Sequence, residues 1–492
     1  MATPAPAPAA SLANVIEALA SIDPPPALVA EAEQLVAFEV DAYIQHRQAP
    51  MAAVLPESET QVREIVARLA ALGVPIVSRG AGTGISGGAT PIAQSVVLVL
   101  TKMRRILSID APARLAVVEP GVPNAQVTVA AQPDGLFFAP DPSSQSVSSI
   151  GGNIAENAGG VHCLKYGLTV HNVMGVRAVD GEGEVLAIGG PAFDSPGYDL
   201  LALLVGSEGN LGVITQATLR LLPGPEATET LLAAFDTVKA GAEAVGAIIG
   251  EGVIPAALEM MDRVVIDACE RYMALGLPQA EALLLVEVDG GREETAEALA
   301  SVERILAACG ATEIRVARSA EERANLWKSR KGAFAALATV MPDYYTMDGS
   351  IPRRALPAVL ERVYELGREY GMVIGNVFHA GDGNMHPCIF YDAARAGELE
   401  RSEELGGKIL ELCIDHGGSI TGEHGVGLEK LKQMCLQFRD GEIAAFHDVK
   451  RAFDPAGVLN PGKAVPTLKR CAEWGGLHVR GGRIPRPEIP RF

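Results

Sequence analysis

Residues 79–91 read RGAGTGISGGATP, a loop with five glycines that directly follows a strand-like segment, VPIVS (74–78). Gly82, Gly84 and Gly87 match the spacing GxGxxG, but the apolar run SVVLVL (95–100) follows. A dinucleotide-binding Rossmann unit requires a helix directly after the glycines, because the helix N-terminus holds the pyrophosphate. NAD binding in that manner is therefore disfavoured. Successive N–H groups of a Gly-rich turn can still bind phosphate, and the alternative for this loop alone is an ordinary surface turn.

Two further Gly-rich stretches lie in the same part of the chain. The segment APDPSSQSVSSIGGNIAENAGGVHCLKYG (139–167) combines small hydroxyl residues with two glycine pairs, and GSEGNLGVIT (206–215) is the second stretch. We expect all three to be loops that approach a ligand closely with their backbone. Three such loops in one domain indicate a long or multiply phosphorylated ligand.

Histidines next to glycines mark the C-terminal half. NVFHAGDGNMHP (376–387) places His379 and His386 on either side of a Gly-Asp-Gly-Asn turn, and GSITGEHGVG (418–427) contains Glu423 and His424. A single histidine is more often structural than a ligand. Two imidazoles at the ends of paired strands, with one carboxylate, are enough for a metal with open positions. The seven-residue spacing is not HExxH, so a zincin protease is disfavoured.

Size and composition restrict the class of protein. The chain has 492 residues, 48% hydrophobic, and 41 basic against 60 acidic residues give a net charge of −19. This balance disfavours nucleic acid and direct docking on an anionic membrane. The apolar runs are too short to span a membrane, and the N-terminus lacks the basic region of a signal peptide. Seven scattered cysteines without CxxC fit a reducing cytoplasm and argue against an iron–sulfur cluster in this chain.

The order of predicted elements divides the chain. Ser58 is the expected N-cap of a helix over 59–72, with Gln61 as its capping-box partner. Residues 231–317 have the order β-α-β-β-α-β, which is the ferredoxin-like pattern. We predict an α+β fold with four parts: a leader and helix (1–49), a ligand-binding domain (50–225), a substrate or cap domain (226–430) and a C-terminal helical segment returning to the first domain (431–492).

The three Gly-rich stretches together resemble the FAD-binding (PCMH-type) domain of the vanillyl-alcohol-oxidase-like flavoproteins. In that family the first loop wraps the FAD pyrophosphate and the second runs along the ribityl chain and the flavin. Some relatives attach FAD covalently through a histidine in the first loop; this loop has none, so the resemblance implies non-covalent FAD. The residues that it implies for cofactor binding are Arg79, Gly80, Ala81, Gly82, Thr83, Gly84, Ile85, Ser86, Pro140, Ser143, Ser144, Ser148, Ser149, Gly152, Asn157, Gly159, Gly160, Glu208, Gly209, Gly212, Val213, Ile214 and Asn460.

The histidine motifs resemble the C-terminal domain of FAD-linked oxidases that act on D-2-hydroxy acids. The resemblance implies that His379, His386 and Glu423 bind a divalent metal, either zinc, manganese or iron. It also implies that His424 is the catalytic base and that Arg330, in LWKSRKGAF, binds the substrate carboxylate. A hydroxy acid suits such a site, because its carboxylate and hydroxyl can chelate one cation. From the residues alone, a charge on a helix surface is an equally good interpretation of Arg330.

From about residue 50 to the C-terminus, including PDYYTMDGSIPRRALP (342–357) and the tail from Asn460 through TLKRCAEWGGLHV, the chain is similar to the FAD-binding D subunits of bacterial glycolate oxidases. The resemblance implies oxidation of a small acid such as glycolate or D-lactate, since Tyr344, Tyr345 and Thr346 stand where relatives acting on 2-hydroxyglutarate offer a lysine. It also implies a second flavin subunit and an iron–sulfur subunit as partners. We expect a cytoplasmic protein, held peripherally at the inner membrane through those partners.

The sequence is compatible with three alternatives. The first is a stand-alone D-lactate or D-2-hydroxyglutarate dehydrogenase. The second is a flavin subunit that only relays electrons, although a relay does not need the four histidine-motif residues together. The third is a metal hydrolase without flavin, which leaves the three Gly-rich stretches unexplained.

Overall fold

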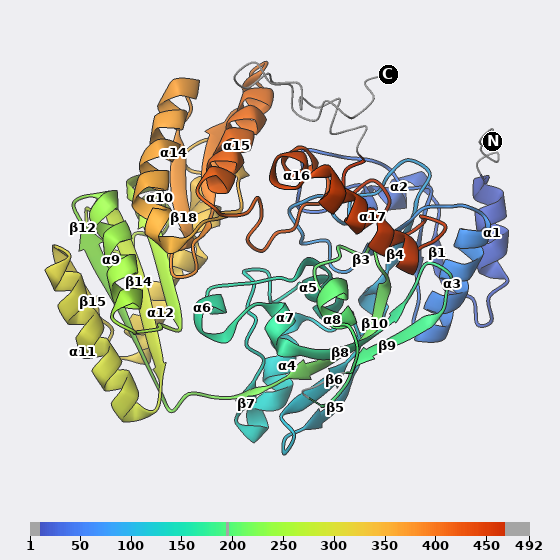
Figure 1. Ribbon diagram of the computed structural model, residues 1–492, viewed down its shortest axis with the longest axis horizontal. Coiled ribbons are helices and arrows are strands. Elements are labelled where there is room, and N and C mark those ends of the chain that lie inside the picture. The colour runs from blue at the N-terminus through green and yellow to red at the C-terminus, as the bar shows by residue number, and fades with distance from the viewer. Residues whose placement is uncertain (1–9, 193–195, 468–492) are drawn as a thin grey trace. The chain divides into compact units, whose positions relative to one another are not determined.

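The computed structural model describes residues 10–192 and 196–467, and the chain forms two compact units (Figure 1). Unit 1 contains the chain up to Ala158, Leu168–Pro223 and the chain from His424 onwards. Unit 2 contains Gly159–Gly167 and Gly224–Glu423. The tail motif TLKRCAEWGGLHV, apart from its first residue, lies outside the described residues. No helix in the described ranges has both the length and the apolar character needed to cross a membrane.

The first sheet of unit 1 carries the glycine loop. Its strand order is β1-β2-β4-β3, in which β2, β4 and β3 are parallel and β1 is antiparallel. Ser58 caps helix α3 by accepting from the N–H of Gln61, as predicted, but the capping box is not formed, because Gln61 Oε1 accepts from the N–H of Glu57. Gly73 (φ 64°) follows the helix end. The glycine loop leaves the carboxyl end of β3, the edge at which parallel sheets usually bind ligands. The elements are β1 (Ala27–Val29), β2 (Ala52–Leu55), α3 (Glu59–Ala71), β3 (Ile76–Arg79) and β4 (Val96–Val99).

The second sheet of unit 1 is antiparallel, in the order β5-β6-β10-β8-β9. Helix α5 (Ile150–Glu156) packs its Ile150 and Ile154 into the same core. We expected a loop here because glycine is a poor helix former, and that prediction was wrong. Ser149 caps the helix and Asn157 ends it with φ 54°, so caps and burial override propensity. The strands are β5 (Ile106–Asp110), β6 (Leu115–Val118), β8 (Val173–Val179), β9 (Val185–Gly189) and β10 (Val213–Arg220).

Unit 2 contains the predicted β-α-β-β-α-β order, with one additional helix, α10, inserted before β14. The strands pair in the order β15-β12-β14-β13 and are all antiparallel. Thr237 caps α9, and Gly241 on that helix lies so close to the sheet that a Cβ atom would stand 3.2 Å from Cβ of Ala282. The elements are β12 (Ala227–Phe235), α9 (Val238–Gly250), β13 (Ala257–Asp262), α10 (Arg263–Met273), β14 (Ala282–Gly290), α11 (Arg292–Ala308) and β15 (Glu313–Val316).

The same sheet continues past β13 into the segment that carries the histidines. Strand β18 pairs with β13, and β19 and β17 follow it, while β20 pairs with β16 and β18. Trp327, Leu337 and Phe390 belong to the buried cluster beneath α10. These elements are α12 (Ala320–Lys331), α13 (Ala333–Leu337), β16 (Asp343–Thr346), β17 (Gly349–Ser350), α14 (Leu356–Tyr370), β18 (Ile374–His379), β19 (Asn384–Met385), β20 (Pro387–Tyr391) and α15 (Glu398–Asp415).

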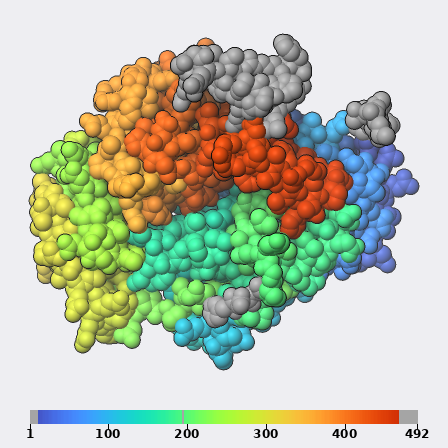
Figure 2. All heavy atoms as spheres, in the orientation of Figure 1, coloured from blue at the N-terminus to red at the C-terminus, as the bar shows by residue number. Residues whose placement is uncertain are grey.

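Two C-terminal helices, α16 (Leu431–Gln437) and α17 (Asp440–Phe453), belong to unit 1. Only Ile443 of α17 is fully buried, and Figure 2 shows this part of the chain, in red, at the surface. Beyond α17 the chain re-enters the unit, because the N–H of Ile76 donates to Val458 O and the N–H of Asn460 donates to Ile76 O. This return places Asn460 next to the strand that leads into the glycine loop.

Candidate metal centre and cofactor loops

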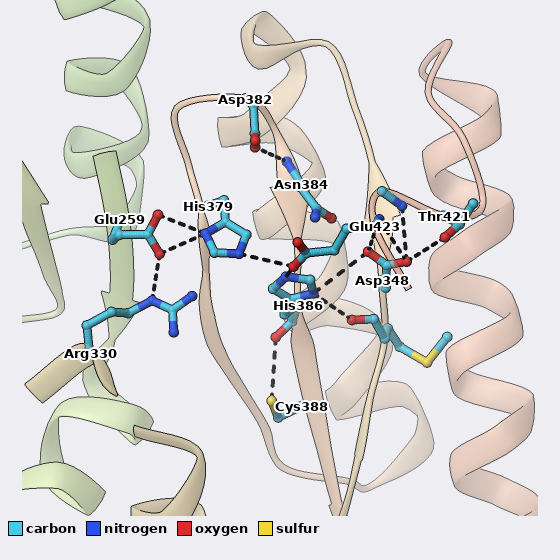
Figure 3. A network of polar contacts seen from close by, with 12 residues as sticks. Glu259, Arg330, Asp348, His379, Asp382, Asn384, His386, Cys388, Thr421 and Glu423 are labelled. Carbon is cyan, nitrogen blue, oxygen red and sulfur yellow. Dashed lines mark hydrogen bonds and ion pairs between the residues drawn. The ribbon is translucent and has the colours of Figure 1, made fainter. Parts of the chain in front are cut away.

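The two predicted histidine ligands lie together at the end of a strand pair in unit 2. His379 ends β18, the turn passes through Gly383 (φ 81°), and Asn384 pairs back with His379 across the ladder. The ring centroids of His379 and His386 are 5.2 Å apart, with the ring planes at 85° (Figure 3). Both side chains are almost completely buried. The predicted turn therefore brings the two imidazoles together, as expected from the spacing.

Glu423 completes the cluster from a loop that follows α15. Its Oε1 atom lies 3.1 Å from Nε2 of both His379 and His386. Asp348, which is fully buried just before β17, shapes this loop by accepting from Thr421 Oγ1 at 2.6 Å and from the N–H groups of Gly422 and Glu423 at 3.0 and 3.1 Å. The carboxylate of Glu423 is thus presented by a turn that a second carboxylate holds in place.

Each histidine uses its Nδ1 atom for a contact away from Glu423. Nδ1 of His386 lies 3.2 Å from the carbonyl oxygen of Met347, and because a carbonyl only accepts, Nδ1 carries the hydrogen. Nδ1 of His379 lies 2.8 and 3.0 Å from the two carboxylate oxygens of Glu259. In both rings Nε2 is therefore the atom directed at Glu423, which is the arrangement of metal-binding histidines with an acceptor behind them.

The electrostatics of the cluster favour a positive charge at its centre. Burial opposes ionisation of Glu423, but the two imidazoles outweigh burial and hold the pKa of this carboxyl well below its ordinary value. Burial also opposes a charged His379, but the carboxylates of Glu259 and Glu423 raise the pKa of His379 well above its ordinary value. A site with two carboxylates around one imidazole is suited to hold a cation.

The donor set fits a divalent metal. One atom each of His379, His386 and Glu423 lies within 4.8 Å of the others. Two imidazole nitrogens and one carboxylate oxygen suit zinc, manganese or iron and leave coordination positions for substrate or water. Bound there, a divalent ion would act as a Lewis acid toward an alcohol.

Arg330 has an unusual position for a long cationic side chain. It lies on α12, is 2% exposed, and its Nε donates to Glu259 Oε2 at 2.6 Å. The interpretation of Arg330 as a surface charge is thereby wrong, because burial and a carboxylate partner fix the guanidinium in the interior. Glu259 consequently joins Arg330 to His379, as Figure 3 shows.

The cofactor loops of unit 1 meet around a buried group of charges. Glu208 accepts from the N–H groups of Val426 and Gly427, each at 2.7 Å. Asn460 donates through Nδ2 to the carbonyls of Gly88 and Glu208, at 3.0 and 2.7 Å. The first loop, the third loop and the closing segment are therefore close together.

The lysine of the same closing segment also contacts the first loop. Lys463 donates to the carbonyls of Gly88, at 2.8 Å, and Thr90. Burial lowers the pKa of Lys463 to about 7. Burial first, and the neighbouring Glu208 second, raise the pKa of Glu156 well above its ordinary value. This buried group of charges links the first Gly-rich loop to the closing segment that contains Asn460 and Lys463.

Buried polar atoms without partners lie in these loops, which is what a polar ligand would satisfy. Among the described residues, the side chains of Ser78, Ser86, Ser148, Asn153 and Glu156 each have a buried atom that makes no hydrogen bond. Such atoms are costly unless a ligand or water satisfies them. The backbone is also closely packed here, because a Cβ on Gly80 would stand 2.2 Å from Ser149 Oγ. The residues therefore fit a large polar cofactor such as FAD.

The other predicted cofactor residues lie in unit 1. Gly159 and Gly160 differ, because they belong to the short segment Gly159–Gly167 of unit 2. In that segment Lys165 and Tyr166 bind Asp289, and His162 lies 3.5 Å from Glu287. His424 is the first residue of unit 1 after Glu423.

Two buried carboxylates of the metal cluster, Glu259 and Asp348, were not predicted from the sequence. The only signal for Glu259 was a charge inside an otherwise apolar strand, IPAALEMM. Its partner His379 is 120 residues away.

Two protein-family models match the chain. Residues 50–189 match the model "FAD binding domain", and residues 224–464 match "FAD linked oxidases, C-terminal domain". The chain belongs to the FAD-linked oxidases. It is 53% identical over 461 residues to the glycolate oxidase subunit GlcD of Escherichia coli K12, covering 94% of this chain and 92% of that protein. It is 39% identical to the subunit of the same name in Bacillus subtilis, covering 87% and 91%.

A D-lactate dehydrogenase of Archaeoglobus fulgidus is 34% identical, covering 84% of this chain and 91% of that protein. Among solved structures, p-cresol methylhydroxylase matches with a TM-score of 0.76 at 17% identity, covering 93% of this chain and 96% of that one. This likeness concerns the fold alone. The predicted α+β flavoprotein fold and the resemblance to glycolate oxidase D subunits are confirmed, and the chain is an FAD-dependent oxidoreductase.

Proposed function

We propose that this chain oxidises glycolate to glyoxylate, with FAD as the immediate electron acceptor. The single observation that carries the proposal is the cluster of His379, His386 and Glu423, with Arg330 joined to it through Glu259. The cluster combines a cation site with a guanidinium, and a 2-hydroxy acid offers complementary groups, an alcohol and a carboxylate. The 53% identical relative from Escherichia coli is a glycolate oxidase subunit, which supports the same substrate.

The roles of the residues follow from their chemistry. When bound, FAD supplies a two-electron acceptor and a divalent metal supplies a Lewis acid that lowers the pKa of the substrate hydroxyl. Arg330 binds and orients the substrate carboxylate through its terminal N–H groups. His424 takes the hydroxyl proton on its imidazole, since an imidazole titrates near neutrality. The carbon–hydrogen bond then breaks with transfer of a hydride equivalent, which leaves the 2-oxo acid.

The cofactor would be held without a covalent bond by the Gly-rich segments of unit 1. Gly80 to Ser86 offer N–H groups for the pyrophosphate, and the buried hydroxyls of Ser86 and Ser148 offer further partners. Asn460 donates to the carbonyl of Glu208, which holds the closing segment against the third Gly-rich stretch. In this proposal electrons leave FAD for a second flavin subunit and an iron–sulfur subunit, because this chain has no CxxC motif for a cluster of its own.

A D-lactate dehydrogenase activity is the second candidate, supported by the 34% identical relative of that name. The residues at Tyr344–Thr346 provide no second cation for a distal carboxylate, so 2-hydroxyglutarate is the least favoured acid. Tyr344 instead donates to the carbonyl of Phe334 at 3.2 Å.

Anaerobic absorbance spectra of the FAD-loaded protein, recorded with glycolate, D-lactate or D-2-hydroxyglutarate, test the proposal. We expect glycolate to bleach the flavin bands fastest, with D-lactate next. Fastest bleaching by another acid would change the substrate. No bleaching by any of the three would refute the proposed oxidation and favour a relay of electrons.

A further inference from the structure

Glu259 is an almost completely buried carboxylate that contacts the proposed metal ligand His379 through Nδ1, the ring nitrogen that does not face Glu423. It is 1% exposed on β13, and the strand register places it directly opposite His379 of β18. Its Oε1 contacts Nδ1 of His379 at 2.8 Å, while Oε2 contacts both His379 Nδ1 at 3.0 Å and Arg330 Nε at 2.6 Å. Both oxygens therefore serve groups of the proposed active site.

The contact with His379 decides which ring nitrogen faces the metal position. An ionised carboxylate only accepts hydrogen bonds, so Nδ1 of His379 must carry its hydrogen. Nε2, which faces Glu423, is then the nitrogen that can bind a cation, which would displace the proton on Nε2. The backbone pairing of β13 with β18 holds this contact, so the ring orientation does not depend on a flexible loop.

The contact with Arg330 leaves the other end of the guanidinium available. Only Nε of Arg330 is engaged by Glu259, and within the described ranges its two terminal nitrogens make no hydrogen bond. The guanidinium carbon lies 5.8 Å from the ring centroid of Phe334, which limits its movement further. Figure 3 shows the terminal nitrogens directed away from Glu259. A planar guanidinium fixed at Nε presents its remaining N–H groups in a defined direction.

We propose that Glu259 is a positioning residue that sets the metal ligand His379 and the carboxylate-binding Arg330 relative to each other. One rigid carboxylate then fixes the spacing between the site of the substrate hydroxyl and the site of its carboxylate. The inference rests on the proposed function, in which these two sites hold the two ends of a 2-hydroxy acid. A buried ion pair by itself is weak evidence for stability, so a purely structural role is the competing explanation.

A glutamine at position 259 cannot replace all three contacts of the carboxylate. If its oxygen takes the place of Oε2, it can accept from Arg330, but the amide N–H₂ group then takes the place of Oε1, which lies 2.8 Å from Nδ1 of His379. If the amide N–H₂ faces His379, Nδ1 must accept, and Nε2 then carries the hydrogen and cannot bind a metal. If the amide faces Arg330 instead, two donors meet at Nε. Glu259→Gln should therefore impair the metal site, the carboxylate site or both, although it is isosteric.

The experiment compares full-length, FAD-loaded wild type with Glu259→Gln and with Asp262→Asn as the matched control. Asp262 is a buried carboxylate on the same strand, and it contacts Tyr364, Asn376 and the N–H of Val265 instead of a proposed ligand. Affinities for Mn²⁺ and Zn²⁺ are measured separately by competition with a chelator, and KM for glycolate is measured at saturating metal. Arg330→Met, which leaves the Glu259–His379 contact in place, separates the two halves of the proposal.

We expect Glu259→Gln to weaken metal affinity by roughly 10- to 100-fold and to raise KM. Asp262→Asn should leave metal affinity within about threefold, and Arg330→Met should raise KM with metal affinity retained. Equal metal affinity in wild type and Glu259→Gln, or equal losses in Glu259→Gln and Asp262→Asn, would overturn the inference while the proposed function stands. A wild type that binds neither ion would instead overturn the metal site itself. If Glu259→Gln does not fold, Glu259→Asp replaces it, since its shorter side chain cannot reach both partners.

Discussion

Replacing Asp348 by asparagine should disturb the loop that presents Glu423. Asp348 is fully buried and accepts from Thr421 Oγ1, Gly422 N and Glu423 N at 2.6–3.1 Å. Asparagine keeps one accepting oxygen and turns an amide N–H₂ group toward the other donors. At least one bond is lost and one pair of donors is brought together.

The magnitude follows from the contacts that are lost. A hydrogen bond to a charged group contributes about 1.5–3 kcal/mol, so the free energy of unfolding should fall by about 3 kcal/mol. For a domain of about 200 residues this corresponds to a decrease in Tm of roughly 6–12 °C. Metal affinity should fall by about 10- to 100-fold as well, because Glu423 loses the turn that orients it.

Thermal unfolding by calorimetry and metal competition measure both effects. The matched control is Asp343→Asn, because Asp343 is only half-buried and accepts from one described backbone N–H, that of Ala393, at 2.9 Å. This control should cost less than about 1 kcal/mol. An unchanged Tm together with unchanged metal affinity in Asp348→Asn would refute the reasoning that Asp348 holds the Glu423 loop.

Three other changes test separate parts of the account. His424→Ala should lower kcat by roughly 10²–10⁴ with FAD retained, and stopped-flow reduction that stays fast would remove His424 from the role of base. Glu208→Gln should weaken FAD binding about tenfold, because glutamine cannot accept from both Val426 N and Gly427 N; unchanged flavin quenching in an FAD titration would contradict this. Ser149→Ala removes the N-cap of α5 and should cost about 0.5–2 kcal/mol, whereas an unchanged Tm for unit 1 would show that the cap is dispensable.

Local patterns predicted the parts of the molecule that depend on neighbours in sequence. Spacing and turn chemistry predict the N-cap at Ser58 and the ferredoxin-like order of unit 2. They also predict that the imidazole rings of His379 and His386 lie close together. Helix α5 was missed because its glycines indicate a loop, while the energy that favours the helix comes from caps and from burial of Ile150 and Ile154.

The carboxylates of Glu259 and Asp348, which contact His379 and the Glu423 loop, could not be predicted, because they come from distant parts of the chain. Glu259 meets His379 only through the pairing of β13 with β18, and Asp348 meets Glu423 from 75 residues away. A carboxylate in an apolar strand is a signal that something buried must satisfy it. The sequence does not say which group does so, since that depends on the order of strands in the sheet.

The central claim is that a divalent metal at His379, His386 and Glu423 is required for oxidation of the hydroxy acid. The most direct test is anaerobic reduction of bound FAD by glycolate in three samples: untreated, depleted of metal with a chelator, and depleted then resupplied with Mn²⁺ or Zn²⁺. Elemental analysis confirms the metal content of each. We predict that the flavin bands bleach in the untreated and resupplied samples and persist in the depleted one. Equally fast bleaching in protein shown to be free of metal would contradict the claim.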